Sequence, residues 1–147
     1  MNRRMIFNAV GMMLRVEAVL LLLPAITSAI YRESEAFAFL SAAVLGYALG
    51  ILPKLLYKPK THVIYAKEGF IIVAFSWIML SLIGALPFII SGEIPRLADA
   101  FFETVSGFTT TGASILTDVE AHSHGVLFWR SFTHWVGGMG VLVFVMA

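Results

Sequence analysis

The sequence contains no cysteine, so it cannot form a disulfide, bind a metal through thiolates or use a cysteine nucleophile. Charge is also scarce: 13% of the 147 residues are charged, and a net charge of +1 gives no basis for binding nucleic acid. Hydrophobic residues, in contrast, make up 59% of the chain. The mean hydropathy of +0.89 is well above that of a typical water-soluble domain. These properties indicate an integral membrane protein whose solvent is lipid.

Apolar runs long enough to cross a bilayer occur at four places in the sequence. A spanning helix needs about 20 apolar residues, each of which adds about 1.5 Å to its length. The candidates are a segment within Met5–Ile30 and the runs Ala36–Leu56, Gly69–Ile90 and Val126–Ala147. A further apolar segment, Leu97–Phe108, is too short to cross. The predicted fold class is therefore an all-α integral membrane protein.

The first apolar run has some features of a secretory signal, because Arg3 and Arg4 precede it and small residues follow at 27–29. Glu17 lies beside this run and the hydrophobicity continues to Ile30, which favours an uncleaved helix. The last run ends at Ala147 without the polar or basic flank that normally closes a spanning helix. We therefore expect the chain to be truncated within its last helix.

Lysine and arginine predict the orientation, because the cytoplasmic loops of membrane proteins carry an excess of these residues. Arg3 and Arg4 place the N-terminus in the cytoplasm, and four lysines between residues 54 and 67 place the second connection there. The stretch 91–124 carries five acidic residues against one arginine, which suits the outside. The charges of all connections agree with one multi-pass topology.

The clearest internal boundary lies at residues 57–62, where Pro59 stands among lysines. It separates an N-terminal transmembrane helical hairpin, residues 1–60, from a second unit, residues 61–147. We expect the second unit to consist of a helix, a re-entrant helix with a loop, and a final helix. This second unit contains the segment in which the sequence predicts function.

That segment, Pro95 to Ser114, reads PRLADAFFETVSGFTTTGAS. Pro95 suits the first turn of a helix, and Gly107 is a natural stop. A helix over Pro95–Ser106 would be about 18 Å long, which is about half the thickness of a bilayer. The chain must therefore enter the membrane here and turn back.

The run that follows, Thr109 to Ser114, is poor in helix formers and is predicted to lie at membrane depth. Non-helical backbone is tolerated there only when protein buries it or when it lines an aqueous path. The hydration shell of a monovalent cation could be replaced by the carbonyl oxygens of Thr110, Thr111, Gly112 and Ala113. Glycine permits backbone conformations that a side chain would oppose, and the negative end of the preceding helix favours a cation. An ordinary extracellular loop has a similar composition, so the residues alone leave both interpretations open.

Two stretches resemble the first repeat of the Trk/Ktr/HKT superfamily of potassium transporters: DAFFETVSGFTTTGAS from Asp99 to Ser114, and WRSFTHWVGGMG from Trp129 to Gly140. LIGALPFIISG, from Leu82 to Gly92, resembles the outer half of the first helix of that repeat. The hairpin before it resembles the two extra helices of the Trk branch. The family implies four such repeats around one pore, each with a filter strand that has a single critical glycine, here Gly112.

By this resemblance the chain is the N-terminal portion, with the first pore repeat only, of a Trk-type potassium uptake protein of the cell (inner) membrane. Thr110 to Ala113 would contact potassium as the transported substrate, and no covalently bound cofactor is expected. The family also implies a homodimer and a cytoplasmic nucleotide-binding regulatory subunit. Ala113 stands where the TVGYG signature of potassium channels has tyrosine, so the filter is expected to be less rigid and strict exclusion of sodium is not assumed.

One filter strand cannot surround an ion, which leaves two alternatives for the chain by itself. It is either a structural or assembly fragment with no transport of its own, which we favour, or one of four copies that assemble into a small channel. Potassium uptake by cells that lack their own transporters would separate these alternatives.

Arg130 and His134 are four residues apart and therefore share one face of the last helix. A charge within the membrane costs about 2.5–3.5 kcal/mol and usually finds a partner. We expect Arg130 to pair with Glu103 or Asp99 and to support the filter; the alternative is that it snorkels to the surface. The glycines within residues 137–140 favour close helix packing, with a gating hinge as the alternative.

Two further interpretations concern the outer loop. A metal ion could be collected by Asp118, Glu120, His122 and His124, but their spacing matches no known ligand set and a solvated loop is preferred. An intramembrane hydrolase would need Ser114 with His122 or His134, and no recognisable triad spacing supports it. We therefore expect no enzymatic activity.

Overall fold

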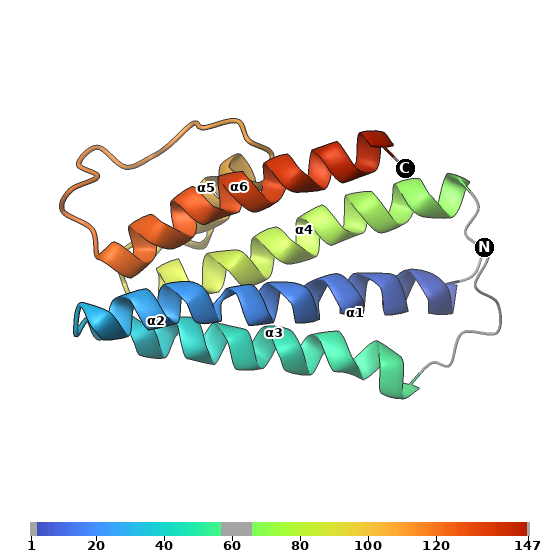
Figure 1. The fold of residues 1–147 in the computed structure, drawn as a ribbon, viewed down its shortest axis with the longest axis horizontal. Coiled ribbons are helices and arrows are strands. Elements are labelled where there is room, and N and C mark those ends of the chain that lie inside the picture. The colour runs from blue at the N-terminus through green and yellow to red at the C-terminus, as the bar shows by residue number, and fades with distance from the viewer. Residues whose placement is uncertain (1–2, 57–65, 147) are drawn as a thin grey trace.

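The computed structural model describes residues 3–56 and 66–146, and it describes side chains within 3–56 and 67–140 (Figure 1). The predicted boundary at residues 57–62 lies outside the described residues. The described part is built from α-helices, which are α1 (Arg3–Leu20), α2 (Leu22–Ile30), α3 (Ala36–Leu56), α4 (Ala66–Ile90), α5 (Leu97–Phe108) and α6 (His124–Met146). The predicted all-α fold class is therefore confirmed.

Helices α1 and α2 form one apolar segment of 28 residues, Arg3–Ile30, with a short interruption at Leu21. Pro24 explains the interruption, because it has no N–H to donate and its ring crowds the carbonyl of Leu20 four residues earlier. The hydrogen bond from the N–H of Leu21 to the carbonyl of Glu17, at 2.8 Å, keeps the two helices nearly in line. The first predicted span is thus a single helical segment, long and apolar enough to cross a membrane, with a proline-induced break.

Helix α3 returns alongside α1 and α2, so these three helices form a hairpin (Figure 1). The helices approach most closely at Gly11 and Gly50, where a Cβ on either residue would lie 2.7 Å from the carbonyl oxygen of the other. Small residues at such a crossing let two backbones meet in lipid, where no hydrophobic effect drives helices together. The hairpin therefore depends on the absence of side chains at two positions.

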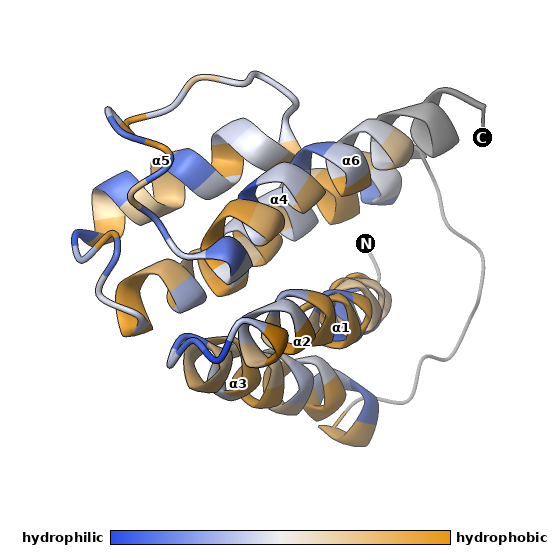
Figure 2. Ribbon diagram, turned by 60° about the vertical axis from the view of Figure 1, so that its left-hand side comes forward, coloured by the Kyte–Doolittle hydropathy of each residue, from blue (hydrophilic) through white to orange (hydrophobic). Residues whose placement is uncertain are grey.

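Three helical segments of the described residues are long and apolar enough to cross a membrane: Arg3–Ile30, Ala36–Leu56 and Lys67–Ile90. Hydrophobic residues dominate these helices, and hydrophilic residues gather mainly in the connections (Figure 2). Helix α6 has 23 residues, which is also long enough, but Arg130 and two histidines interrupt its apolar character. Its crossing of the bilayer stays a prediction.

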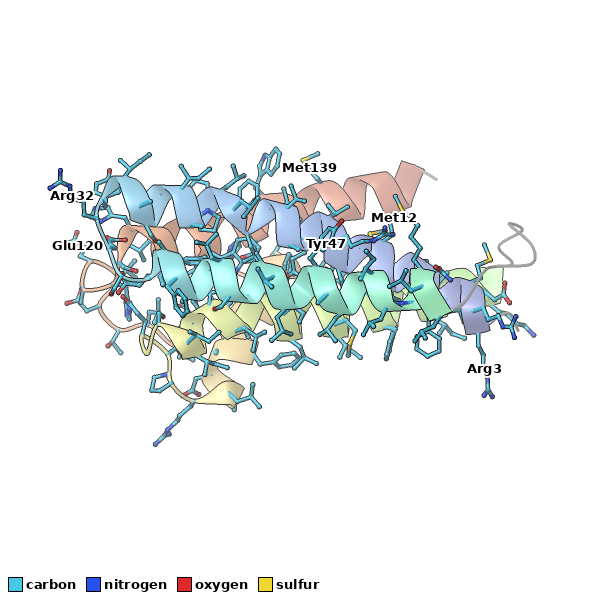
Figure 3. All side chains as sticks on the ribbon, turned by 90° about the horizontal axis from the view of Figure 1, so that it is seen from below. Arg3, Met12, Arg32, Tyr47, Glu120 and Met139 are labelled. Carbon is cyan, nitrogen blue, oxygen red and sulfur yellow. The ribbon has the colours of Figure 1, made fainter. Side chains whose placement is uncertain are left out.

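Some charged side chains lie at the two ends of the bundle, and exposed apolar side chains lie between these ends. Figure 3 shows Arg3 at one end and Arg32 and Glu120 at the other. The exposed side chains of Met12 and Met139 lie between these ends. An apolar belt of this kind fits a lipid environment and would be unfavourable in water.

The core lies where α4, α5 and α6 meet the hairpin. Trp129 of α6 is fully buried there, and its indole N–H donates to the carbonyl of Gly84 in α4 at 2.9 Å. Phe108, the last residue of α5, packs edge-on against Trp129 with 6.3 Å between the ring centroids. This aromatic contact fixes the inner end of α5, from which the candidate filter segment begins.

Candidate functional site

Helix α5 is a half-length helix that begins at the end of the bundle where Arg32 and Glu120 lie (Figure 3). It runs over 12 residues, Leu97–Phe108, which corresponds to about 18 Å. The sequence predicted a helix over Pro95–Ser106, so its length was right but both ends lie two residues further along. Arg96 has extended backbone angles and accepts the first helical hydrogen bond, from the N–H of Ala100. Pro95 therefore precedes the helix instead of occupying its first turn.

Gly107 does not stop the helix, in contrast to the prediction. A Cβ on Gly107 would lie 2.1 Å from the hydroxyl oxygen of Thr133, so this glycine lets α6 approach α5. The helix ends one residue later in a Schellman motif, in which Thr111 N–H donates to Ser106 and Thr110 N–H donates to Gly107, both at 2.9 Å. Contact with α6, and not the end of the helix, explains the glycine.

The left-handed residue of this motif is Thr110, with φ +58°. A β-branched residue is a clear outlier there, because glycine normally takes this position. Such strain costs on the order of 1–3 kcal/mol and is concentrated at functional sites. The surroundings of Thr110 must therefore hold it in place.

The candidate filter segment, residues 109–114, begins deep in the bundle. A Cβ on Gly137 of α6 would lie 2.0 Å from the carbonyl oxygen of Phe108, so the two backbones touch. Gly137 is 13 residues beyond His124, the first residue of α6, which places this contact about 20 Å from the N-terminal end of the helix. The expected packing role fits Gly137, whereas a Cβ on Gly140 would meet no atom within 4 Å.

The segment itself is exposed and has no regular secondary structure from Thr111 to Leu116. It is neither a continuation of α5 nor a spanning helix, as predicted. Gly112 has φ +78°, and a Cβ there would meet no atom within 4 Å. Its backbone conformation, and not a lack of space, therefore favours glycine at this position.

Hydrogen bonds turn two carbonyl groups of the segment away from α5. The N–H groups of Thr111 and Gly112 donate to the carbonyl of Ser106, at 2.9 and 3.4 Å. In a trans peptide the N–H and the preceding carbonyl point in opposite directions. The carbonyl oxygens of Thr110 and Thr111 therefore point to the open side of the segment, as an ion-coordinating backbone requires.

Glu103 anchors the C-terminal end of the segment. Its carboxylate accepts hydrogen bonds from the hydroxyl of Ser114 at 2.8 Å and from the N–H of Ile115 at 3.1 Å. The same carboxylate is paired with the Nε of Arg130, and Glu103 is only 2% exposed. The structure thus brings Arg130 to Glu103, not to Asp99. The paired charges and two further hydrogen bonds compensate for burial of the carboxylate.

Ser106 contacts the segment through its side chain as well. Its hydroxyl donates to the carbonyl oxygen of Ala113 at 2.5 Å, across seven residues of sequence. Nothing in the sequence marked this serine, because a buried helical serine usually bonds to a carbonyl of its own helix.

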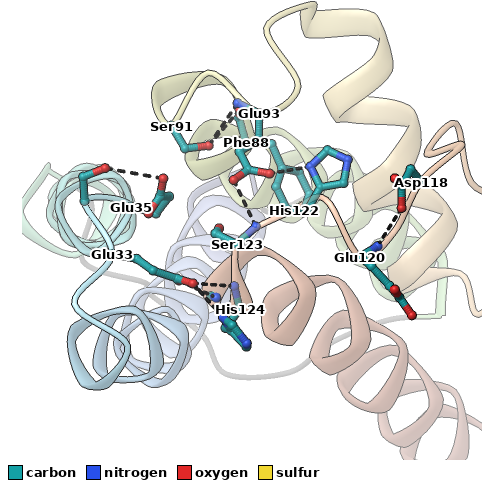
Figure 4. Close-up of polar contacts among 12 residues, drawn as sticks. Glu33, Glu35, Phe88, Ser91, Glu93, Asp118, Glu120, His122, Ser123 and His124 are labelled. Atoms are coloured by element: carbon teal, nitrogen blue, oxygen red, sulfur yellow. Dashed lines mark hydrogen bonds and ion pairs between the residues drawn. The ribbon is translucent and has the colours of Figure 1, made fainter.

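The outer loop is tied to two other connections through carboxylates (Figure 4). Glu93 accepts from the N–H of Ser123 at 3.1 Å and contacts the ring of His122. Glu33, between α2 and α3, accepts from the N–H groups of His124 at 2.9 Å and Gly125 at 3.2 Å. These carboxylates satisfy the free N–H groups at the start of α6 and face the positive end of its dipole.

These contacts shift the pKa of the Glu33 carboxyl group. Burial by itself would raise the pKa of this carboxyl, but hydrogen bonds from His124 and Gly125 and the charge of His124 outweigh it. The pKa of Glu33 therefore lies below its usual value. The ring of Tyr31 also stacks on His124, with 3.8 Å between the centroids.

These contacts bear on the metal and hydrolase alternatives. No cluster of three or more metal-ligating side chains exists within the described residues. Ser114 donates to Glu103, whereas the ring of His134 contacts the carbonyl of Arg130 at 2.9 Å. The serine and the histidines that a hydrolase would need are thus engaged with different partners.

Comparisons with known proteins agree on one family. The model of the TrkH family, described as cation transport protein, matches residues 35–147. The Trk system potassium uptake protein TrkH of Salmonella typhimurium is 37% identical over the whole chain, which spans 31% of that protein. An uncharacterized cation transporter of Methanocaldococcus jannaschii is 33% identical over 94% of the chain and 29% of its own length.

A solved structure has the same fold. The crystal structure of the potassium transporter TrkH from Vibrio parahaemolyticus matches 97% of this chain and 31% of its own chain, with a TM-score of 0.91 and 33% identity. Sequence and fold thus point to the same kind of multi-pass membrane protein, and the named relatives are transporters, not enzymes. The chain belongs to the TrkH family of cation transport proteins.

Proposed function

We propose that this chain takes part in potassium uptake across the cell membrane, as the N-terminal portion and first pore-forming repeat of a Trk-type transporter. Its relative in Salmonella typhimurium is named as a potassium uptake protein. The chain spans about a third of that relative, 31%, so the remaining pore repeats would come from elsewhere in the full-length protein.

The observation that carries this proposal is the orientation of the backbone after α5. Thr110 and Thr111 direct carbonyl oxygens to the open side of a segment that starts about 20 Å from the N-terminal end of α6. Oxygen dipoles without a fixed negative charge suit a dehydrated monovalent cation. The C-terminal end of α5 adds a negative dipole at the same place.

We assign the ion path to Thr109–Ser114, with potassium contacts at Thr110, Thr111, Gly112 and Ala113. Glu103 and Arg130 would support the filter, because their ion pair holds Ser114 and Ile115 from behind. A carbonyl oxygen has two lone pairs, so Ala113 can accept the bond from Ser106 and still face an ion.

In the proposed orientation the protein lies in a bacterial-type inner membrane, with its N-terminus on the cytoplasmic side. Arg3 lies at the end of the bundle opposite to Arg32 and Glu120 (Figure 3), and Lys54 lies in the last turn of α3, the helix that leads back to that end (Figure 1). This supports a cytoplasmic location for the first end under the positive-inside rule. We further propose a homodimer of the full-length protein, surrounded by lipid, with a cytoplasmic nucleotide-binding regulatory subunit.

The test uses cells that lack their own potassium uptake systems. The full-length protein that carries this chain, the 147-residue chain by itself and an empty vector are compared at low external potassium, with cell potassium as the readout. We expect the full-length protein to restore growth and potassium content, and the chain by itself to remain silent. Restoration by the chain by itself would instead support an assembly of four copies. A full-length protein that is present in the membrane but restores nothing would refute the proposed function.

A further inference from the structure

Ser106 contacts three of the four residues that are proposed to bind the ion. Its carbonyl oxygen accepts from the N–H groups of Thr111 at 2.9 Å and Gly112 at 3.4 Å. Its hydroxyl donates to the carbonyl of Ala113 at 2.5 Å. The residue is 4% exposed, so water does not compete effectively for these bonds. One buried residue, through its backbone carbonyl and its hydroxyl, thus contacts the segment at three consecutive positions.

The bond to Ala113 matters because this residue has no large side chain of its own to hold it. Its methyl group cannot prop the backbone in the way an aromatic ring can, and Ala113 is exposed. The next residues, Ser114 and Ile115, are anchored by Glu103. Between the turn at Thr111 and that anchor, the hydroxyl of Ser106 is the contact that orients the Ala113 carbonyl.

We propose that Ser106 is a positioning residue that sets ion selectivity by fixing the direction of the Ala113 carbonyl through a hydrogen bond to one lone pair of its oxygen; this inference rests on the proposed function. A filter prefers potassium over sodium when its oxygens cannot move inward to follow the smaller ion, or when their number and field strength stay constant. Loss of the hydroxyl frees the Ala113 carbonyl to rotate. Sodium then gains more than potassium, while the path itself stays open.

The experiment compares Ser106→Ala with Ser106→Thr in the full-length protein that carries this chain. Uptake of rubidium, as a tracer for potassium, and of sodium is measured in the same cells at matched membrane expression. We expect Ser106→Ala to lower the rubidium-to-sodium ratio about three- to tenfold, the factor that one neutral hydrogen bond supplies. Rubidium uptake remains, and Ser106→Thr, which keeps a hydroxyl, restores most of the ratio.

Ser76→Ala is the matched control. Ser76 is also a buried helical serine, 7% exposed in α4, and its hydroxyl has no hydrogen-bond partner among the described residues. The same atom is removed, so a general effect of a lost buried hydroxyl would appear in this variant too. We expect its rubidium-to-sodium ratio to equal that of the unmodified protein.

The outcomes separate this inference from the proposed function. An unmodified protein that takes up no rubidium refutes the proposed function itself. Normal rubidium uptake with an unchanged ratio in Ser106→Ala overturns the role of Ser106 and leaves the proposed function standing. An equal fall of the ratio in Ser76→Ala also overturns it. If Ser106→Ala does not reach the membrane, Ser106→Cys, whose S–H is a weak donor, takes its place. A lower rubidium-to-sodium ratio in Ser106→Cys supports the role of Ser106, and an unchanged ratio overturns it.

Discussion

Gly112 and Gly92 offer a direct test of the proposed ion path, because the two glycines are matched in geometry. Their φ angles are +78° and +79°, and a Cβ on either residue would meet no atom within 4 Å. Alanine at either position therefore introduces conformational strain without a steric clash. That strain is about 1–2 kcal/mol for an L residue in the left-handed region. Gly92 lies between α4 and α5, outside the candidate filter segment.

We expect Gly112→Ala and Gly92→Ala to lower the thermal unfolding midpoint of the full-length protein in detergent by similar amounts. Their transport should differ. In Gly112→Ala the strain is relieved when the peptides beside residue 112 rotate, which turns carbonyl oxygens away from the ion path. A strain of this size changes the population of the native backbone about 5- to 30-fold. Potassium uptake should fall by a comparable factor in Gly112→Ala and stay unchanged in Gly92→Ala.

The measurement is the initial rate of rubidium uptake at equal amounts of protein in the membrane, together with the unfolding midpoint of each purified variant. Equal uptake by the two variants would contradict the assignment of Gly112 to the ion path. A much lower unfolding midpoint for Gly112→Ala than for Gly92→Ala would contradict the claim that only strain separates glycine from alanine there.

Three further predictions concern the contacts around the segment. Arg130→Ala leaves the buried Glu103 carboxylate without its partner and should destabilise the protein by about 3–5 kcal/mol, measured by unfolding in detergent. The double variant Arg130→Ala/Glu103→Ala should lose less stability than Arg130→Ala, because no unpaired charge stays buried. An equal or larger loss of stability in the double variant would contradict the pairing. Gly137→Ala places a methyl group against Phe108 and should cost about 1–3 kcal/mol, whereas Gly140→Ala should change little; similar unfolding midpoints would argue against the close approach of α5 and α6. Because the pKa of Glu33 is lowered in the fold, its stabilising effect is complete above its unfolded pKa of about 4.3 and is lost as the pH falls through the folded value. The difference in unfolding midpoint between the unmodified protein and Glu33→Gln should therefore shrink as the pH is lowered from 7 toward 3, and a constant difference would be inconsistent with it.

Local sequence properties predicted the helices well. The run Ala36–Leu56 is helix α3 with the same bounds, and the start of α6 lies two residues before the predicted Val126. Both follow from long apolar runs, which a lipid solvent selects regardless of tertiary contacts. The ends of α5 were less well predicted, because Pro95 was interpreted as part of the first turn and Gly107 as a stop signal. The glycine at position 107 is explained by its contact with Thr133 of α6, which is 26 residues further along the chain, so no local signal could indicate it.

The supporting contacts of the candidate site divide in the same way. An arginine within a membrane-spanning helix needs a partner, so the pairing of Arg130 with an acid of α5 could be expected, although the choice of Glu103 over Asp99 could not. The carboxylates that cap α6 were not predicted at all. Glu33 is 91 residues before His124, and no pattern in either neighbourhood indicates that they meet.

The sequence by itself determined that the chain is a membrane protein and which residues form its helices. It also determined that α5 is too short to cross the bilayer and that Gly112 follows α5 in a non-helical run. These features depend on the length and composition of adjacent residues, so they are present before any folding. The tertiary structure decided how deep the segment lies and which way its carbonyl groups point. It also decided that Ser106 and Glu103 bind the segment and that Glu33 binds the start of α6. Such contacts depend on helix packing in three dimensions, because hydrogen bonds form between whichever polar groups the packed helices bring within reach.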